Sequence, residues 1–199
     1  MPLRIEDHGV GNTVMIQPAL LQQLNGRIEL RGDGNSVTIG APAQSHELAI
    51  GLGSRSRVVI GPHCLLGHLL IHTEDQAEIV IGPASAFNGA VRFLLHEPGR
   101  ISLGEFCLFG GEVDVTISDM HSILDAASGA RVNPARDVTL GDRVWVGQRS
   151  MILKGVTIGH DAIIGAGAVV TRSVPAHCIA AGNPARVVRR GVRWRPELL

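Results

Sequence analysis

The sequence predicts an all-β fold in which the chain winds into a parallel β-helix of six-residue repeats. An aliphatic residue returns every six positions in the C-terminal half, a period that neither an α-helix (3.6) nor an ordinary strand (2) produces. A repeat of fixed length is the signature of a repeat architecture and indicates the fold more strongly than the propensities of short segments. The residue that follows is usually Gly, which tolerates a tight corner. The aliphatic positions are Leu140, Val146, Ile152, Ile158, Ile164 and Val170.

A second inward position supports this interpretation. Four places after each aliphatic residue comes a small or β-branched one, so six residues make one side of a triangular coil and eighteen make one turn. One bulky and one small side chain per side then fill a narrow core. These second positions are Val144, Ser150, Val156, Ala162 and Ala168.

The composition agrees with a thin solenoid. Of 199 residues 45% are hydrophobic but only 3% aromatic, and there is no Tyr. We interpret the shortage of rings as a core too narrow for them, built from Val, Ile, Leu and Ala. The formal net charge is zero, and basic residues are not interleaved with aromatic ones. Both observations argue against a nucleic-acid partner.

The repeat divides the chain into three parts. A longer version begins near residue 36, with aliphatic residues spaced by 21 or 22 positions. We expect an irregular segment or a first coil over 1–35, the β-helix over 36–172, and a cap over 173–199 that folds back on the exposed end.

One interval breaks the pattern. Leu103 and Leu140 are 37 residues apart, which leaves residues 118–136 as an insertion ejected at a corner. Long loops in compact proteins are usually functional, and insertions in solenoids often mark the binding face. The alternative is a loop that only packs on a neighbouring subunit.

The cysteines and the apolar pattern suit a cytoplasmic protein. Three cysteines are an odd number, and Cys64 and Cys107 occupy small inward positions, so we expect buried thiols. There is no apolar run of about 18 residues to span a membrane. The N-terminus lacks the basic and apolar regions of a signal peptide.

Residues that can carry chemistry gather in and beside the loop. His121 lies in the loop six positions after Val115, where an imidazole is a plausible general base; the alternative is a polar loop residue. Asp119 is a weaker candidate for orienting the ring. Trp145 falls on an outward position, where it suits a contact with a ligand or with another subunit.

The C-terminus gathers arginines. Six of them can bind a phosphorylated cofactor; the alternative is a solvated cap. They are Arg172, Arg186, Arg189, Arg190, Arg193 and Arg195.

The histidines suggest metal only weakly. His68 and His72 have helical spacing in a segment that is not helical, and His63 and His160 stand apart. We expect no metal.

Several motifs, found in order between about residues 101 and 193, together resemble the hexapeptide-repeat acyltransferases. Within that family the chain looks like the sugar and polysaccharide O-acetyltransferases of bacteria. The motifs are Asp119-Met-His-Ser-Ile, Asn133-Pro-Ala, Val144-Trp-Val-Gly, Ile152-Leu-Lys-Gly-Val-Thr-Ile-Gly, Ile164-Gly-Ala-Gly-Ala-Val-Val-Thr and Ala180-Ala-Gly-Asn-Pro-Ala-Arg.

The resemblance implies a left-handed coil, a homotrimer with active sites between subunits, and acetyl-CoA as the donor of the acetyl group. It makes His121 the general base and places Asn88 at the acetyl or acceptor end. It also implies donor contacts from Trp145, Ala166, Gly167, Thr171, Arg172, Arg186, Arg189 and Arg190, with Gln148 standing where some members carry Ser near the thioester.

The function expected is O-acetyl transfer to a hydroxyl of a sugar or bacterial surface polysaccharide, directly and without an acyl-enzyme. Two alternatives remain open. One is a non-catalytic β-helix scaffold, and the other is a zinc lyase of the γ-carbonic-anhydrase type, which shares the fold.

Overall fold

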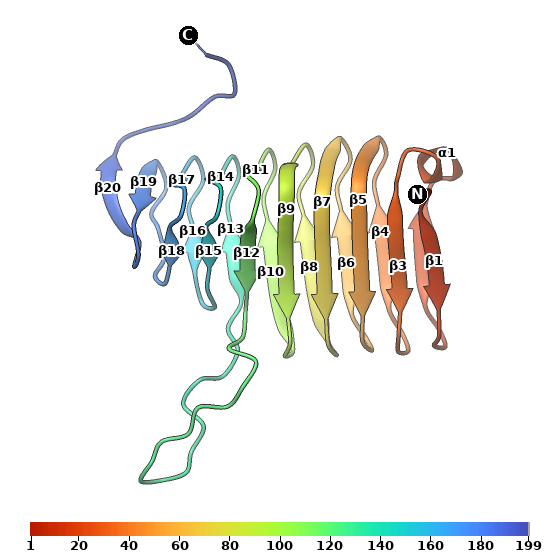
Figure 1. The fold of residues 1–199 in the computed structure, drawn as a ribbon, viewed down its shortest axis with the longest axis horizontal. Coiled ribbons are helices and arrows are strands. Elements are labelled where there is room, and N and C mark those ends of the chain that lie inside the picture. The colour runs from red at the N-terminus through yellow and green to blue at the C-terminus, as the bar shows by residue number, and fades with distance from the viewer. Residues whose placement is uncertain (199) are drawn as a thin grey trace.

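The computed structural model describes residues 1–198 and is a parallel β-helix with a triangular cross-section. In Figure 1 the chain descends on the near face, rises on the far face and advances from the N-terminal to the C-terminal end, which makes the coil left-handed. One α-helical turn, α1 (Pro18–Leu21), lies at the N-terminal end. The all-β, left-handed fold expected from the sequence is confirmed.

Each side of the triangle is a ladder of parallel strands. On one side the ladder consists of β2 (Thr13–Ile16), β4 (Ser36–Ile39), β6 (Arg57–Ile60), β8 (Ala77–Ile81), β10 (Gly99–Leu103), β13 (Val138–Leu140) and β16 (Thr157–Ile158).

The other two sides share three long strands. β5 (Ala43–Leu52), β7 (Cys64–Thr73) and β9 (Ala86–Leu95) each run ten residues and continue from one side onto the next. The first halves of β7 and β9 continue the side of β11 (Leu108–Phe109), β14 (Trp145–Val146), β17 (Ile163–Ile164) and β19 (Cys178–Ala181). The second halves continue the side of β1 (Arg4–Asp7), β3 (Gly26–Leu30), β12 (Val113–Thr116), β15 (Met151–Ile152) and β18 (Val169–Val170).

The core follows the six-residue pattern. All the bulky and small inward positions named from the sequence between 140 and 170 are buried, with at most 2% of their surface exposed. Cys64, Cys107 and Cys178 are also buried, and none forms a disulfide. Ser150, the one polar residue of the series, donates its hydroxyl to the Gly147 carbonyl oxygen at 2.7 Å, which satisfies it inside the core.

The idea that the core has no room for rings is wrong. Phe87, Phe93 and Phe109 are buried and pack together, with ring centroids 5.0 to 6.1 Å apart. Small inward residues of the same coils, Ser85 and Cys107, leave the space that the rings occupy. A triangular core therefore accepts large side chains where its partner positions are small.

Both ends of the coil are covered. The parallel pairing of β1 with β3 and of β2 with β4 forms a coil within residues 1–35, where the sequence left an irregular segment open. Leu20 and Leu24, in and just after α1, are buried against that first coil. At the other end, β20 (Arg186–Arg190) turns back and pairs antiparallel with β19.

The 118–136 insertion leaves the coil after β12 and projects away from it (Figure 1). Residues 119–132 are exposed, whereas Ser118 and Asn133 at its base are buried. The ejected loop predicted from the broken period is thus present. Among residues 1–198, no helix is long and apolar enough to cross a membrane.

Candidate active site

The inserted loop is a fixed hairpin because one buried amide holds its base together. The Asn133 side chain accepts a hydrogen bond from the Ile123 N–H (2.7 Å). It donates to the carbonyl oxygen of His121 and to the carboxylate of Asp119, both at 2.8 Å. Three points on the outgoing limb are therefore tied to one side chain on the returning limb.

Two ion pairs reinforce this base. Arg131 donates to both oxygens of Glu97, at 2.6 and 2.7 Å, and the Ser118 hydroxyl donates to the same carboxylate at 2.5 Å. Arg131, and then Ser118, lower the pKa of Glu97 to about 2. Lys154 donates to Asp119 at 2.5 Å and, with Asn133, lowers the pKa of that carboxyl. We call Glu97, Ser118, Asp119, Arg131, Asn133 and Lys154 the loop clamp.

The far end of the loop closes on itself. The Asp125 carboxylate accepts hydrogen bonds from the N–H groups of Ala127 and Ser128, and Leu124 pairs with Arg131 in an antiparallel bridge. An aspartate that bonds the backbone a few residues on is a local turn former. The insertion is therefore an ordered arm.

His121 is exposed, and its main chain is held on both sides. Its N–H donates to the Asp119 carbonyl oxygen at 2.7 Å, and its own carbonyl accepts from Asn133. Within residues 1–198 its ring makes no hydrogen bond. The suggestion that Asp119 orients the ring is not supported, because the Asp119 carboxylate bonds Lys154 and Asn133 instead.

Asn88 does not meet His121 within one chain. It lies near the start of β9, beside a groove over the N-terminal coils that Asn25, Gln44 and His46 also line. Six residues of strand, about 20 Å, separate it from Leu94, which pairs with Thr116 just before the loop. The loop then projects further away (Figure 1). Within one chain, the two expected residues therefore lie on different parts of the surface.

Four of the expected donor-binding residues lie together. Trp145 points outward from β14 with 40% of its surface exposed. Gln148 and Gly167 share one corner of successive coils, where the Gly167 N–H donates to the Gln148 carbonyl at 2.8 Å. Ala166 packs so closely there that a Cβ on Gly147 would lie 2.6 Å from its nitrogen. The corner thus offers backbone groups, and the strand that leads to it carries the exposed indole.

The expected basic patch is spread more widely than the sequence suggested. Arg186 lies opposite Ala181, beside the corner that carries Ala166 and Gly167. Arg189 and Arg190 lie towards the other end of the same strand pair, where Arg190 is opposite Cys178. Thr171 and Arg172 follow β18, at the next corner of the coil. Only Arg186 is close to the Gly167 turn.

Several residues of this region were not identified from the sequence. Trp194 packs its ring 5.9 Å from that of Trp145 and donates its Nε1–H to the Arg143 carbonyl at 2.6 Å. The C-terminal tail thus returns to the face that carries Trp145. The chain has only two tryptophans, and this rarity could have suggested from the sequence that they lie together. No sequence signal pointed to Glu97, Arg131 and Lys154, since charged residues near a loop are common.

Comparisons with known proteins identify a repeat family and several similar enzymes. Residues 137–172 match the family described as bacterial transferase hexapeptide, six repeats. The polysialic acid O-acetyltransferase of Escherichia coli O1:K1 / APEC is 31% identical over 59% of this chain, but over only 38% of its own length. The enzyme of the same name from Neisseria meningitidis is 29% identical over 75% of this chain and 69% of its own.

Two solved structures are similar over nearly the whole chain. The polysialic acid O-acetyltransferase OatWY has a TM-score of 0.88 at 25% identity, covering 98% of this chain and 93% of that one. The polySia-specific acetyltransferase NeuO has a TM-score of 0.75 at 26% identity, with coverages of 98% and 90%. Residues 137–172 are therefore bacterial transferase hexapeptide repeats, and the resemblance of the chain to the hexapeptide-repeat acyltransferases is confirmed.

Proposed function

We propose that this protein is an acetyl-CoA-dependent O-acetyltransferase that modifies a hydroxyl of a sugar or of a bacterial surface polysaccharide. The observation that carries the proposal is the position of His121. It stands on an arm fixed by the loop clamp, with its main chain bonded on both sides and its ring free of partners among residues 1–198. A general base needs a fixed place and an unoccupied nitrogen.

The proposed reaction is a direct transfer. A neutral His121 nitrogen takes the proton of the acceptor hydroxyl as the oxygen attacks the thioester carbonyl of acetyl-CoA. The tetrahedral intermediate collapses, the C–S bond breaks, and the proton passes from His121 to the leaving sulfur. Asn88 or a backbone N–H stabilises the oxyanion. The thiols of Cys64, Cys107 and Cys178 are buried, so an acyl-enzyme on cysteine plays no part.

The donor is proposed to lie along the corner of Trp145, Gln148, Ala166 and Gly167, with the arginines of β20 towards its phosphates. The Gly167 turn has a positive φ of 70° and open space beside it, which suits an approach by the pantetheine arm. Guanidinium groups suit phosphates because they donate in pairs.

We further propose a homotrimer in which the arm of one subunit completes the site of the next. Met120, Ile123, Leu124 and Val132 on the arm are each 54 to 57% exposed, and a partner subunit would cover them. The same arrangement brings His121 of one copy to Asn88 of another. A cytoplasmic location is also part of the proposal, since three unpaired thiols suit a reducing compartment.

The acceptor is best sought among sialic acid polymers, because two relatives and two similar structures bear that name. The groove beside Asn88 is lined by amides, hydroxyls and imidazoles such as those of Asn25, Ser45 and His68, with no Arg or Lys. Such groups bond sugar hydroxyls whether or not the polymer is charged.

An acceptor screen tests the proposal. Purified protein is incubated with acetyl-CoA and either polysialic acid or a neutral galactoside, and release of the CoA thiol is followed. We expect turnover with at least one acceptor and an alkali-labile acetyl ester in the product. Absence of acetyl-CoA binding in calorimetry would favour the scaffold alternative, and hydration of CO₂ by metal-loaded protein would favour the lyase.

A further inference from the structure

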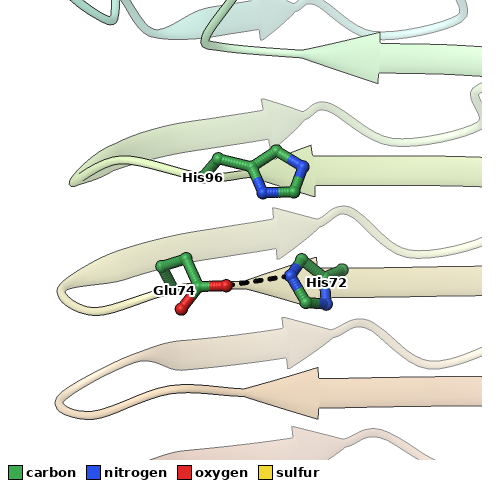
Figure 2. A group of neighbouring side chains, drawn as sticks. All are labelled: His72, Glu74 and His96. Atoms are coloured by element: carbon green, nitrogen blue, oxygen red, sulfur yellow. Dashed lines mark hydrogen bonds and ion pairs between the residues drawn. The ribbon is translucent and has the colours of Figure 1, made fainter. Parts of the chain in front are cut away.

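A second group of reactive side chains lies on the outer surface between β7 and β9. His72 stands near the end of β7, Glu74 follows in the next turn, and His96 comes directly after β9 on the neighbouring coil. Figure 2 shows these side chains, from two neighbouring coils, gathered at one corner. One ligand atom from each residue lies within 4.8 Å of the others.

The register of the coils places them there. Along a strand, side chains alternate between the two faces, and the buried residues at this corner are Thr73 and Leu95. His72 and Glu74 therefore point outward on one coil, and His96 does so on the next. His72 pairs with Leu94 in the ladder, so His96 lies two residues further along, beside Glu74. The backbone register therefore brings the three residues to one corner.

The spacing suits a small metal ion. His72 Nε2 and Glu74 Oε1 are 3.1 Å apart, close to the separation of about 3.3 Å between ligand atoms around a tetrahedral zinc ion. Three atoms within 4.8 Å of one another have a common centre no more than 2.8 Å from each (4.8 divided by √3). Small side-chain rotations then reach the zinc–ligand distance of about 2.0–2.2 Å.

The ligand types narrow the choice of ion. Two imidazoles and one carboxylate are ligands of zinc and similar divalent transition metals, whereas calcium and magnesium prefer oxygen. Each neutral imidazole offers one ring-nitrogen lone pair to a metal ion. The Glu74 side chain is 52% exposed, which leaves further coordination positions open to water.

The carboxylate of this group is not paired with a basic side chain, unlike the carboxylates of two similar groups of histidines and acidic residues. Asp161, between His160 and His177, accepts hydrogen bonds from Arg143 on both carboxylate oxygens, at 2.8 and 2.5 Å. Glu6 and Glu29, beside His8, share the guanidinium of Arg27. Over residues 1–198, Glu74 pairs with no Arg or Lys, since the nearby Arg31 donates to the Thr73 carbonyl instead.

We propose that His72, Glu74 and His96 bind one zinc ion, or a similar divalent transition-metal ion, per chain. The ion would link the coil of β7 to the coil of β9. The residue after His96 is Glu97 of the loop clamp. The metal site is separate from the proposed transfer reaction, and it runs against the expectation, drawn from the sequence, that the protein takes no metal.

Metal titration of untagged, chelator-treated protein tests the site. Zinc is added against a chromophoric chelator at slightly alkaline pH, and cobalt is added in a parallel titration to follow its visible absorption. We expect one equivalent of tightly bound zinc and tetrahedral cobalt bands. Loss of a group that only holds a metal ligand in place commonly weakens a metal site about 10- to 100-fold. His72→Gln and His96→Gln remove a ligand itself, so each should weaken binding at least about tenfold.

Matched variants make the outcome decisive. His68→Gln removes a histidine of the same strand that faces Glu47, and His177→Gln alters the group around Asp161; both should bind zinc normally. Absence of stoichiometric binding, binding that survives His72→Gln and His96→Gln together, or binding lost in His177→Gln would each overturn the proposal. If His96→Gln fails to fold without metal, His72→Gln and Glu74→Gln carry the same test.

Discussion

At the scale of single residues, His121 combines a rigid backbone with a free ring. Asn133 bonds its carbonyl, and its own N–H bonds Asp119. The ring, by contrast, contacts solvent and contributes little packing. Stability and activity should therefore respond very differently to its removal.

His121→Ala should lower turnover by about 10²–10⁴, the usual contribution of a general base. Its free energy of unfolding should change by less than about 0.5 kcal/mol, as at surface sites. The wild-type rate should fall in acid, because only the neutral ring accepts a proton, and the variant should lose this dependence. Steady-state kinetics and denaturant titration measure both, with His8→Ala as the control. Near-normal turnover in His121→Ala would make it an ordinary loop residue.

The arginines of β20 offer a second test at the scale of single residues. Arg189→Ala and Arg190→Ala should each weaken acetyl-CoA binding about ten- to a hundredfold, since a hydrogen bond to a charged group contributes about 1.5–3 kcal/mol. Calorimetric titration with acetyl-CoA measures the change. Arg57→Ala, on the N-terminal coils beside Glu78, should bind normally. Unchanged affinity in both variants would mean that the arginines only cover the end of the coil.

At the scale of elements, the arm is an appendage whose order depends on the loop clamp. Glu97 lies outside the arm, in the turn after β9, and holds Ser118 and Arg131 from there. Its pKa is lowered to about 2 from an ordinary 4.5. A lowered carboxyl pKa stabilises the folded form above pH 4.5, and this contribution is lost as the pH falls from about 4.5 to about 2.

Glu97→Gln should loosen the arm at neutral pH, because it removes the charge that Arg131 pairs with. Amide hydrogen exchange, normalised to the intrinsic rate, should rise over residues 118–136 and stay slow over the coils of 137–172. Wild-type protein should show the same rise only below about pH 4.5. Glu112→Gln, which removes an exposed pair with Arg149, is the control. An arm equally protected in Glu97→Gln would show that Asn133 alone holds it.

The aromatic cluster of Phe87, Phe93 and Phe109 contributes three large buried rings to the core. Phe109→Ala should lower the free energy of unfolding by about 3–5 kcal/mol, the usual cost of removing a buried ring and leaving a cavity. Phe106 stands nearby with 55% of its surface exposed, so Phe106→Ala should cost far less. Denaturant titration of both variants compares them. Equal losses would mean that the rings do not stabilise the coil as a cluster.

At the scale of the whole molecule, a single chain keeps the arm with His121 apart from the groove beside Asn88. The arm projects away from the coil (Figure 1). The groove beside Asn88 lies over the N-terminal coils, and apolar side chains on the arm are exposed. A second and third copy of the chain would cover these side chains and join the two halves of the site.

Sedimentation equilibrium should therefore give a mass of about 63 kDa, three times that of the 21.1 kDa chain. Leu124→Asp should shift the mass towards the monomer, since it places a charge where an apolar side chain is expected to be buried. Val10→Asp, at an exposed position in the first coil, should leave the assembly intact. A wild-type mass near 21 kDa would contradict the trimer.

The sequence by itself determined the coil, its inward positions and the ejected loop. A six-residue period acts through contacts between successive coils, and these repeat regularly enough to be read along the chain. Leu140 to Val170 are buried as expected for that reason. The position of His121 on the loop followed from the same count.

Only the tertiary structure decided what lies side by side without sharing the period. Trp194 returns to Trp145, and Glu97 reaches Arg131 across 34 residues. His72 and His96 likewise become neighbours because the register of β7 and β9 sets His72 beside Leu94. Such contacts depend on corner geometry and strand register, which no local pattern records.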